Sequence, residues 1–249
     1  MGRRALATVG LALAALAAGI ALLLSRGHDR PAPRAGSLTP VAPRVPPKRP
    51  APSGPLGARL LRRTQLRERP GGPVVRAVGR FTGYGSVRVL AVVKRRGHWL
   101  GVLSDHMPNS RLAWIPAAAA ELLHEPYRMD VDLSARLLTV RHEGRVVRRV
   151  RVAVGRAESS TPTGHFAVTD SLRIGPGSSA YGCCALALTG RQPNVPQGWS
   201  GGDRVAIHGT TNESSIGTPA SSGCMRAAES DMRWLLRRIT LGSQVRIRA

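Results

Sequence analysis

The stretch "AIHGTTNESSIGTPASSGCMRAA" at residues 206–228 places a histidine and a cysteine at the two ends of a small, polar, Gly-rich segment. The apolar run "RVAIH" at 204–208 predicts a strand, so that His208 stands at the end of a rigid element. His208 and Cys224 could be a base and its nucleophile, two metal ligands or two unrelated side chains. The residues around them decide between these interpretations.

The glycines beside the two residues favour nucleophilic chemistry. A cysteine becomes a nucleophile where its thiolate is favoured by a histidine or by local amides. Gly223 lets the backbone turn sharply before Cys224, and the amides of both residues can point at a bound carbonyl oxygen. Gly209 has no side chain, so its carbonyl is free to accept the Nδ1 proton of His208 and to set the tautomer. This pattern predicts acyl transfer through a covalent intermediate.

The other cysteines offer little support for a metal site. A zinc site needs about four ligands, and only Cys183, Cys184 and His165 could join the pair, at no standard spacing. We therefore expect no metal and no cofactor. A bond between the adjacent Cys183 and Cys184 would close a strained ring, and we expect a structural role for them before the apolar run "ALAL". The odd number of cysteines leaves at least one free thiol.

The sequence on both sides of the segment is mainly β. Residues 129–155 predict two strands joined by a turn at Glu143 and Gly144, followed by "TPTGHFAV" at 161–168 and then Gly/Pro-rich loops through 202. Apolar residues recur with helical spacing from Met232 to Ile239, and Gly242 ends that predicted helix. "QVRIR" predicts a closing strand.

"HGT", a short spacer and "SSGCMR", together with "TPTG" upstream and the helix downstream, resemble the L,D-transpeptidase catalytic domain family. The resemblance covers about residues 127–249. It departs from the family at Ser222, where many members carry histidine, which affects substrate contacts more than the nucleophile. The resemblance implies a β-sandwich domain with one helix after the catalytic cysteine.

It also implies a reaction on peptidoglycan. Cys224 would attack the carbonyl of the third residue of a tetrapeptide stem and expel the terminal D-alanine. His208 would act as the base, oriented by the carbonyl of Gly209, and the amides of Gly223 and Cys224 would hold the oxyanion. An amine on a second stem would resolve the thioester as a 3→3 cross-link.

Further site residues follow from the same resemblance. Arg226 would pair with a substrate carboxylate, since a guanidinium binds one bidentately. Ser222 and Thr210 would contact the substrate as well. The family is also sensitive to carbapenem β-lactams, which acylate the same cysteine, and it needs no metal or organic cofactor.

The preceding region, residues 58–125, predicts short strands and no catalytic constellation. The turn "RRG" at 95–97 separates two of these strands, and an alanine-rich helical turn follows "AWIP". "GHWLGVL" and the "WIP" ending resemble a bacterial SH3-like domain, so we expect a small SH3-like barrel before the catalytic domain. The strands are expected at 74–78, 87–93, 98–103 and 113–116.

The N-terminal region predicts attachment to a membrane. Twenty uncharged residues at 5–24 follow Arg3 and Arg4, a length that spans a bilayer core of about 30 Å. We expect a signal anchor over residues 1–27, with a cleaved signal peptide as the alternative. Residues 28–57 are rich in proline and predict an extended linker.

The charge of the chain indicates an anionic neighbourhood. Its 37 basic and 14 acidic residues give a net charge of +23, which fits stem peptides and anionic cell-wall polymers. A nucleic-acid partner is not expected, because no aromatic-basic motif or groove-reading helix accompanies the charge. We expect the catalytic domain outside the membrane, in the cell envelope. Hydrolysis of the same acyl-enzyme, as an L,D-carboxypeptidase, and non-catalytic binding to the wall remain the alternatives.

Overall fold

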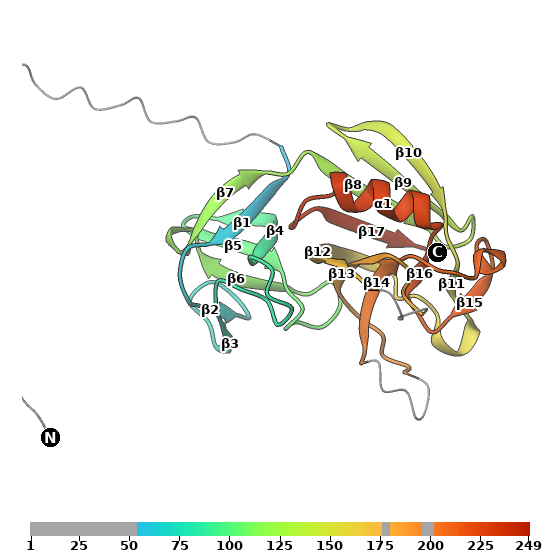
Figure 1. The fold of residues 1–249 in the computed structure, drawn as a ribbon. Coiled ribbons are helices and arrows are strands. Elements are labelled where there is room, and N and C mark those ends of the chain that lie inside the picture. The colour runs from blue at the N-terminus through green and yellow to red at the C-terminus, as the bar shows by residue number, and fades with distance from the viewer. Residues whose placement is uncertain (1–53, 176–179, 196–201) are drawn as a thin grey trace, which may run out of the picture. The chain divides into compact units, whose positions relative to one another are not determined.

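The computed structural model describes residues 54–175, 180–195 and 202–249, and this part of the chain is mainly β, as the sequence predicts (Figure 1). The expected anchor and all but the end of the expected linker lie outside the described residues. Within the described ranges, no helix combines the length and the apolar character that crossing a membrane requires.

The first sheet has seven strands in the order β3-β2-β6-β5-β4-β1-β7, and every pair in it is antiparallel. Its core contains the fully buried side chains of Leu60, Leu66, Leu90, Leu100 and Ile115. The strands are β1 (Leu56–Leu60), β2 (Thr64–Arg67), β3 (Val74–Val78), β4 (Val89–Arg96), β5 (Trp99–Leu103), β6 (Leu112–Pro116) and β7 (Ala120–His124).

The structure adjusts several details predicted for this region. β1 begins at Leu56, inside the expected linker. β4 continues to Arg96, so that the turn is confined to Gly97, with φ +55°, and His98. The expected helical turn is a short 3₁₀ helix, η1 (Ala117–Ala119), and β7 follows it. The SH3-like assignment stays a prediction.

The second sheet has eight strands in the order β10-β9-β8-β17-β12-β13-β14-β16. The parallel strands β11 and β15 form a separate two-stranded sheet in the same part of the chain. The strands are β8 (Tyr127–Asp132), β9 (Leu137–His142), β10 (Arg145–Arg151), β11 (Val154–Gly155), β12 (Gly164–Arg173), β13 (Cys184–Arg191), β14 (Arg204–His208), β15 (Pro219–Ser221), β16 (Met225–Arg226) and β17 (Gln244–Arg248).

The segment expected to form two strands forms three strands of the second sheet, followed by the two-residue strand β11. The missed turn lies between β8 and β9 and contains neither glycine nor proline, so the sequence does not signal it. Arg136 adopts a positive φ of 51° there, and the carboxylate of Asp132 accepts a hydrogen bond from the amide of Ala135 at 2.8 Å. The turn at Glu143 and Gly144, with φ of 49° and 78°, is confirmed.

The prediction of loops through residue 202 was wrong, because it missed β13. Leu186 and Leu188 of this strand are fully buried in the core, whereas Ala185 and Ala187 occupy its other face. Small alanines alternating with leucines gave a weak strand pattern, and the Gly-rich flanks hid it further. The strand matters for function because it pairs with β14.

The helix α1 (Glu229–Arg238) confirms the predicted amphipathic helix. Met232 and Leu235 are fully buried and pack into the core of the second sheet, against residues such as Ile207 and Met225. Acidic residues in its first turn and basic residues in its last turn complement the helix dipole. α1 therefore covers one face of β13, β14 and β16.

Candidate active site

β14 and β16 bring the two ends of the 206–228 segment together. The strands are parallel, with Ile207 opposite Met225 and His208 opposite Arg226. Successive side chains of a strand point to opposite faces. Ile207 and Met225 are buried in the core, so His208, Arg226 and Cys224 occupy the other face, away from α1.

These residues line one narrow cavity of about 80 Å³. A cavity of this volume can admit part of a larger substrate. Cys224 is the free cysteine and is partly exposed, and its Sγ lies 3.7 Å from the carbonyl oxygen of Arg204. The lining includes Tyr181, Gln192, Arg204, His208, Ser222, Cys224 and Arg226.

His208 is buried and held by the contact that the sequence predicts. Its Nδ1 lies 2.7 Å from the carbonyl oxygen of Gly209. Because a carbonyl only accepts, Nδ1 donates this hydrogen bond and the lone pair is on Nε2. Burial lowers the pKa of His208 to about 4, with Arg226 acting in the same direction and the Gly209 hydrogen bond opposing. The imidazole is therefore a neutral base near pH 7.

The thiol of Cys224 is protonated in the resting site. Burial raises its pKa, while the backbone amide of Ala206 and the charge of Arg226 lower it by less. The expectation that the surroundings favour the thiolate is therefore not met before a substrate binds. A protonated thiol beside a neutral imidazole fits general-base activation, in which the proton moves as the sulfur attacks.

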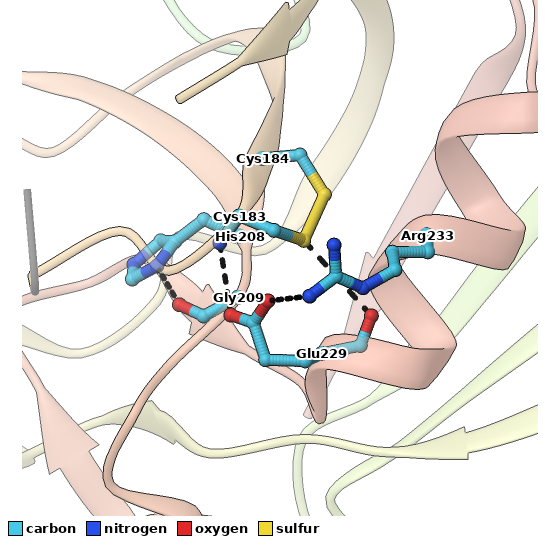
Figure 2. The surroundings of a disulfide bond; sticks show 6 residues. All are labelled: Cys183, Cys184, His208, Gly209, Glu229 and Arg233. Atoms are coloured by element: carbon cyan, nitrogen blue, oxygen red, sulfur yellow. Dashed lines mark hydrogen bonds and ion pairs between the residues drawn. A yellow bond between two sulfur atoms is a disulfide. The ribbon is translucent and has the colours of Figure 1, made fainter. Parts of the chain in front are cut away.

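Gly209 lies in a close contact that leaves no room for a side chain (Figure 2). A Cβ at this position would lie 2.5 Å from Oε1 of Glu229. The same Oε1 accepts a hydrogen bond from the amide of Cys183 at 2.9 Å, and Oε2 accepts one from Arg233 at 3.1 Å. Position 209 therefore requires glycine for steric reasons, in addition to the role of its carbonyl in orienting His208.

A disulfide joins Cys183 and Cys184 directly behind this contact (Figure 2). The carbonyl of Cys184 accepts a hydrogen bond from the amide of Gly209 at 3.0 Å. The next residue, Ala185, is paired with His208 across the two strands. The pair that the sequence assigns to a structural role thus supports the backbone that holds the histidine.

Gly223 contributes a turn, and the structure does not support the predicted role of its amide. Its φ is +114°, and a Cβ would lie 2.3 Å from Nε2 of Gln192. Its amide donates to Oγ of Ser221 at 3.1 Å, and this hydroxyl donates to the carbonyl of Cys224 at 2.5 Å. The amide that was expected to hold an oxyanion is therefore engaged within the loop.

The predicted substrate-contacting residues separate into two groups. Arg226 and Ser222 line the cavity, and Ser222 Oγ accepts a hydrogen bond from Arg156 at 3.3 Å. The buried Nε of Arg226 has no hydrogen-bond partner in the described part of the chain. Thr210 is buried instead, and its hydroxyl accepts a hydrogen bond from the amide of Asn212 at 3.1 Å. This local turn does not support a substrate contact at Thr210.

Two residues at the cavity were not predicted. The ring of Tyr181 meets the imidazole of His208 edge to face, with centroids 4.9 Å apart. Gln192 is buried and donates to the carbonyls of Ser159 and Ser160 at 3.0 and 2.8 Å. Both lie at the ends of the unpredicted β13. The sequence signal for Tyr181 was the presence of a tyrosine within a Gly-rich segment.

No metal centre accompanies this site in the residues that the structure describes, because no three side chains of His, Cys, Asp or Glu converge there in a way that could hold an ion.

Comparisons with known proteins find similarity to L,D-transpeptidases. The model of the L,D-transpeptidase catalytic domain family matches residues 126–247. "Putative L,D-transpeptidase YkuD" of Bacillus subtilis (strain 168) is 32% identical over 122 residues, which cover 49% of this chain and 66% of that protein. The chain thus matches just under two thirds of this relative.

Solved structures that are similar include L,D-transpeptidases at low sequence identity. An L,D-transpeptidase of Mycobacterium tuberculosis H37Rv has a TM-score of 0.43 and 18% identity, over 55% of this chain and 72% of that one. An LD transpeptidase in complex with imipenem has a TM-score of 0.42 and 18% identity, over 64% of this chain and 90% of that one.

Proposed function

From the match of residues 126–247 to the model of the L,D-transpeptidase catalytic domain family, we infer that the protein is a peptidoglycan L,D-transpeptidase. The observation that carries this proposal is the single narrow cavity that contains both the free thiol of Cys224 and the neutral imidazole of His208. Two such groups on neighbouring strands supply a nucleophile and its base.

The acylation step uses the protonation states found in the site. His208 Nε2 takes the thiol proton while Cys224 Sγ attacks the carbonyl carbon of the third stem residue. A C–S bond forms and the carbonyl oxygen becomes an oxyanion. Collapse of this intermediate breaks the C–N bond to the terminal D-alanine, and His208 returns the proton to the departing amine. The Gly209 carbonyl keeps the imidazole in the required tautomer throughout.

Two groups are proposed to stabilise charge during this step. The Cys224 amide remains the donor for the oxyanion, since the Gly223 amide is already bonded to Ser221. Arg226 has a buried guanidinium nitrogen without a partner in the described residues, which suits a substrate carboxylate. Ser222 lines the cavity and accepts a hydrogen bond from Arg156.

The second step distinguishes transfer from hydrolysis. In transfer, the amine of an acceptor stem attacks the thioester, and Cys224 leaves as the thiol while a 3→3 cross-link forms. In hydrolysis, water takes the place of the amine and the product is a tripeptide. The family match favours transfer.

The setting of the enzyme follows from its substrate. Peptidoglycan lies outside the cytoplasmic membrane, so we propose that the domain works in the cell envelope. The net charge of +23 supports attraction to anionic wall polymers. The signal anchor remains part of this proposal.

The test is mass spectrometry of the products. The full-length protein is incubated with a purified disaccharide-tetrapeptide, beside a Cys224→Ala control. We expect release of D-alanine and a product whose mass equals that of two substrate molecules less one D-alanine. A tripeptide product alone would assign the enzyme to hydrolysis. Absence of D-alanine release by folded protein would contradict the proposal.

A further inference from the structure

A hairpin of the first sheet presents two exposed aromatic rings. This 79–88 hairpin connects β3 to β4, and its arms are joined by the bridge between Phe81 and Val87 and by the hydrogen bond from the Thr82 amide to the Ser86 carbonyl at 2.9 Å. Phe81 is 55% exposed and Tyr84 is 58% exposed. Exposed large apolar side chains gathered at one place mark binding surfaces.

The base of this hairpin is held rigidly. The buried side chain of Arg88 donates to the carbonyls of Gly79 and Phe81 at 3.1 and 3.0 Å, and it pairs with Asp105 at 3.4 Å. Asp105 also pairs with Arg204 at 2.9 Å. Because Arg204 lines the Cys224 cavity, one carboxylate connects the hairpin to the strand beside the nucleophile.

The hairpin lies on the same face of the second sheet as the cavity. Thr82 donates a hydrogen bond to the buried carboxylate of Asp170 on β12. Asp170 is opposite Ala187, and Ala187 is opposite Ala206. Ile207 is opposite Met225 in a parallel pair, so the preceding residues, Ala206 and Cys224, lie at the same height on their two strands. Three strand spacings therefore separate Asp170 from Cys224, or roughly 14 Å.

Tyr181 is an aromatic residue at the cavity itself. Its ring meets that of His208, and it lines the cavity. Burial raises the pKa of Tyr181, and the charges of Cys224 and Tyr84 raise it further. Tyr181 therefore lies beside the base at the cavity, and the charge of Tyr84 at the tip of the hairpin acts on it.

The saccharide of the substrate lies beyond the reacting group that enters the cavity. Phe81 and Tyr84 do not line that cavity, so they are available to a part of the substrate farther from the thiol. From the third residue back to the sugar, a stem peptide spans at most about 11 Å. The stem alone falls short of the roughly 14 Å between Cys224 and Asp170, which Thr82 of the hairpin contacts, so the attached saccharide is the part of the substrate that reaches the hairpin. Aromatic rings suit a sugar because its C–H faces stack on them, whereas its hydroxyl groups remain in water.

We propose that the 79–88 hairpin binds the saccharide to which the reacting stem is attached, through the rings of Phe81 and Tyr84. The inference rests on the proposed function and extends it. The first sheet thereby completes the substrate-binding surface of the catalytic domain, and the enzyme selects stems that are attached to glycan over free peptides.

The experiment compares two substrates on the full-length protein, a disaccharide-tetrapeptide and the same free tetrapeptide. D-alanine release gives kcat/KM for each, on wild type, on the Phe81→Ala/Tyr84→Ala variant and on Val147→Ala. Val147 is a matched control because it is 47% exposed on β10, at the opposite edge of the second sheet. Acylation by imipenem reports the intact catalytic site independently of any saccharide.

We expect wild type and Val147→Ala to prefer the disaccharide substrate by about tenfold, the effect of losing two aromatic contacts. The hairpin variant should lose this preference while imipenem acylation and tetrapeptide turnover stay unchanged. An unchanged preference in the variant, or no preference in wild type, would overturn the proposal. Equal slowing on both substrates would place the stem, rather than the saccharide, on the hairpin. Failure of imipenem to acylate any protein would instead count against the proposed function.

Discussion

The two faces of the sheet formed by β13, β14 and β16 differ in what their side chains do. One face is covered by α1 and consists of large apolar side chains such as Leu186, Ile207 and Met225, all fully buried. The other has alanines at 185, 187 and 206, and beside them the reactive residues His208 and Cys224. The first face supplies stability, and the small residues of the second leave room for a substrate beside a rigid histidine.

The largest effect should come from removing the base on the site face. His208→Gln keeps a polar side chain of similar reach but cannot take the thiol proton. We expect acylation of Cys224 by imipenem to slow about 10²- to 10⁴-fold, the usual contribution of a general base. Stopped-flow kinetics measures the rate, and circular dichroism checks the fold. A rate within threefold of wild type would contradict the role of His208.

On the core face we expect a substitution to lower stability and to leave the acylation rate nearly unchanged. Leu235→Ala removes a fully buried side chain of α1, which should lower the free energy of unfolding by about 2–5 kcal/mol. The acylation rate of the folded protein should stay within about threefold of wild type, because Leu235 points away from the cavity. Urea unfolding and imipenem kinetics on the same preparation separate the two effects. A large loss of rate without loss of stability would show that the two faces are not separate.

The pH dependence of stability should report on His208, which lies on the site face. Its pKa is lowered from 6.5 to about 4, so the unfolded chain takes up this proton between these values and the folded chain does not. Stability therefore falls as the pH drops from 6.5 towards 4, by about 3 kcal/mol in all. His208→Gln should lose this part of the slope, as thermal unfolding across the range would show.

The acylation rate should follow the same group. The imidazole is a competent base above its pKa of about 4 and is protonated below it. We expect a rate that does not fall between pH 7 and 5 and that drops below pH 4 while circular dichroism is still native. A midpoint near 6.5 would show that His208 is not buried in the reacting enzyme.

A smaller effect tests the support behind the histidine. Gly209→Ala would place a Cβ 2.5 Å from Glu229 Oε1, and such overpacking costs about 1–3 kcal/mol. Acylation should slow as the Gly209 carbonyl shifts. The double variant Gly209→Ala/Glu229→Ala removes the collision and should recover part of the rate. No recovery would assign the loss to the other close contact of the added Cβ, the Cys183 amide nitrogen at 3.1 Å, rather than to Glu229.

The predictions for the site rest on stronger sequence signals than those for its surroundings. His208, Gly209 and Cys224 were predicted because each stands at a fixed place beside a predicted strand or turn, and the structure brings His208 and Cys224 to one cavity. Tyr181 and Gln192 could not, because they depend on β13, whose alternating alanines give little strand signal. For the Gly223 amide and Thr210, residue types alone did not reveal that a backbone amide and a hydroxyl can bond within their own loop, as both do here.

The most direct test of the central claim, that Cys224 is the nucleophile, is intact-mass spectrometry of the full-length protein with imipenem. One drug-sized adduct should form on wild type and map to the peptide that contains Cys224, and none should form on Cys224→Ala. An adduct that persists in this variant, or its absence from folded wild-type protein, would contradict the account.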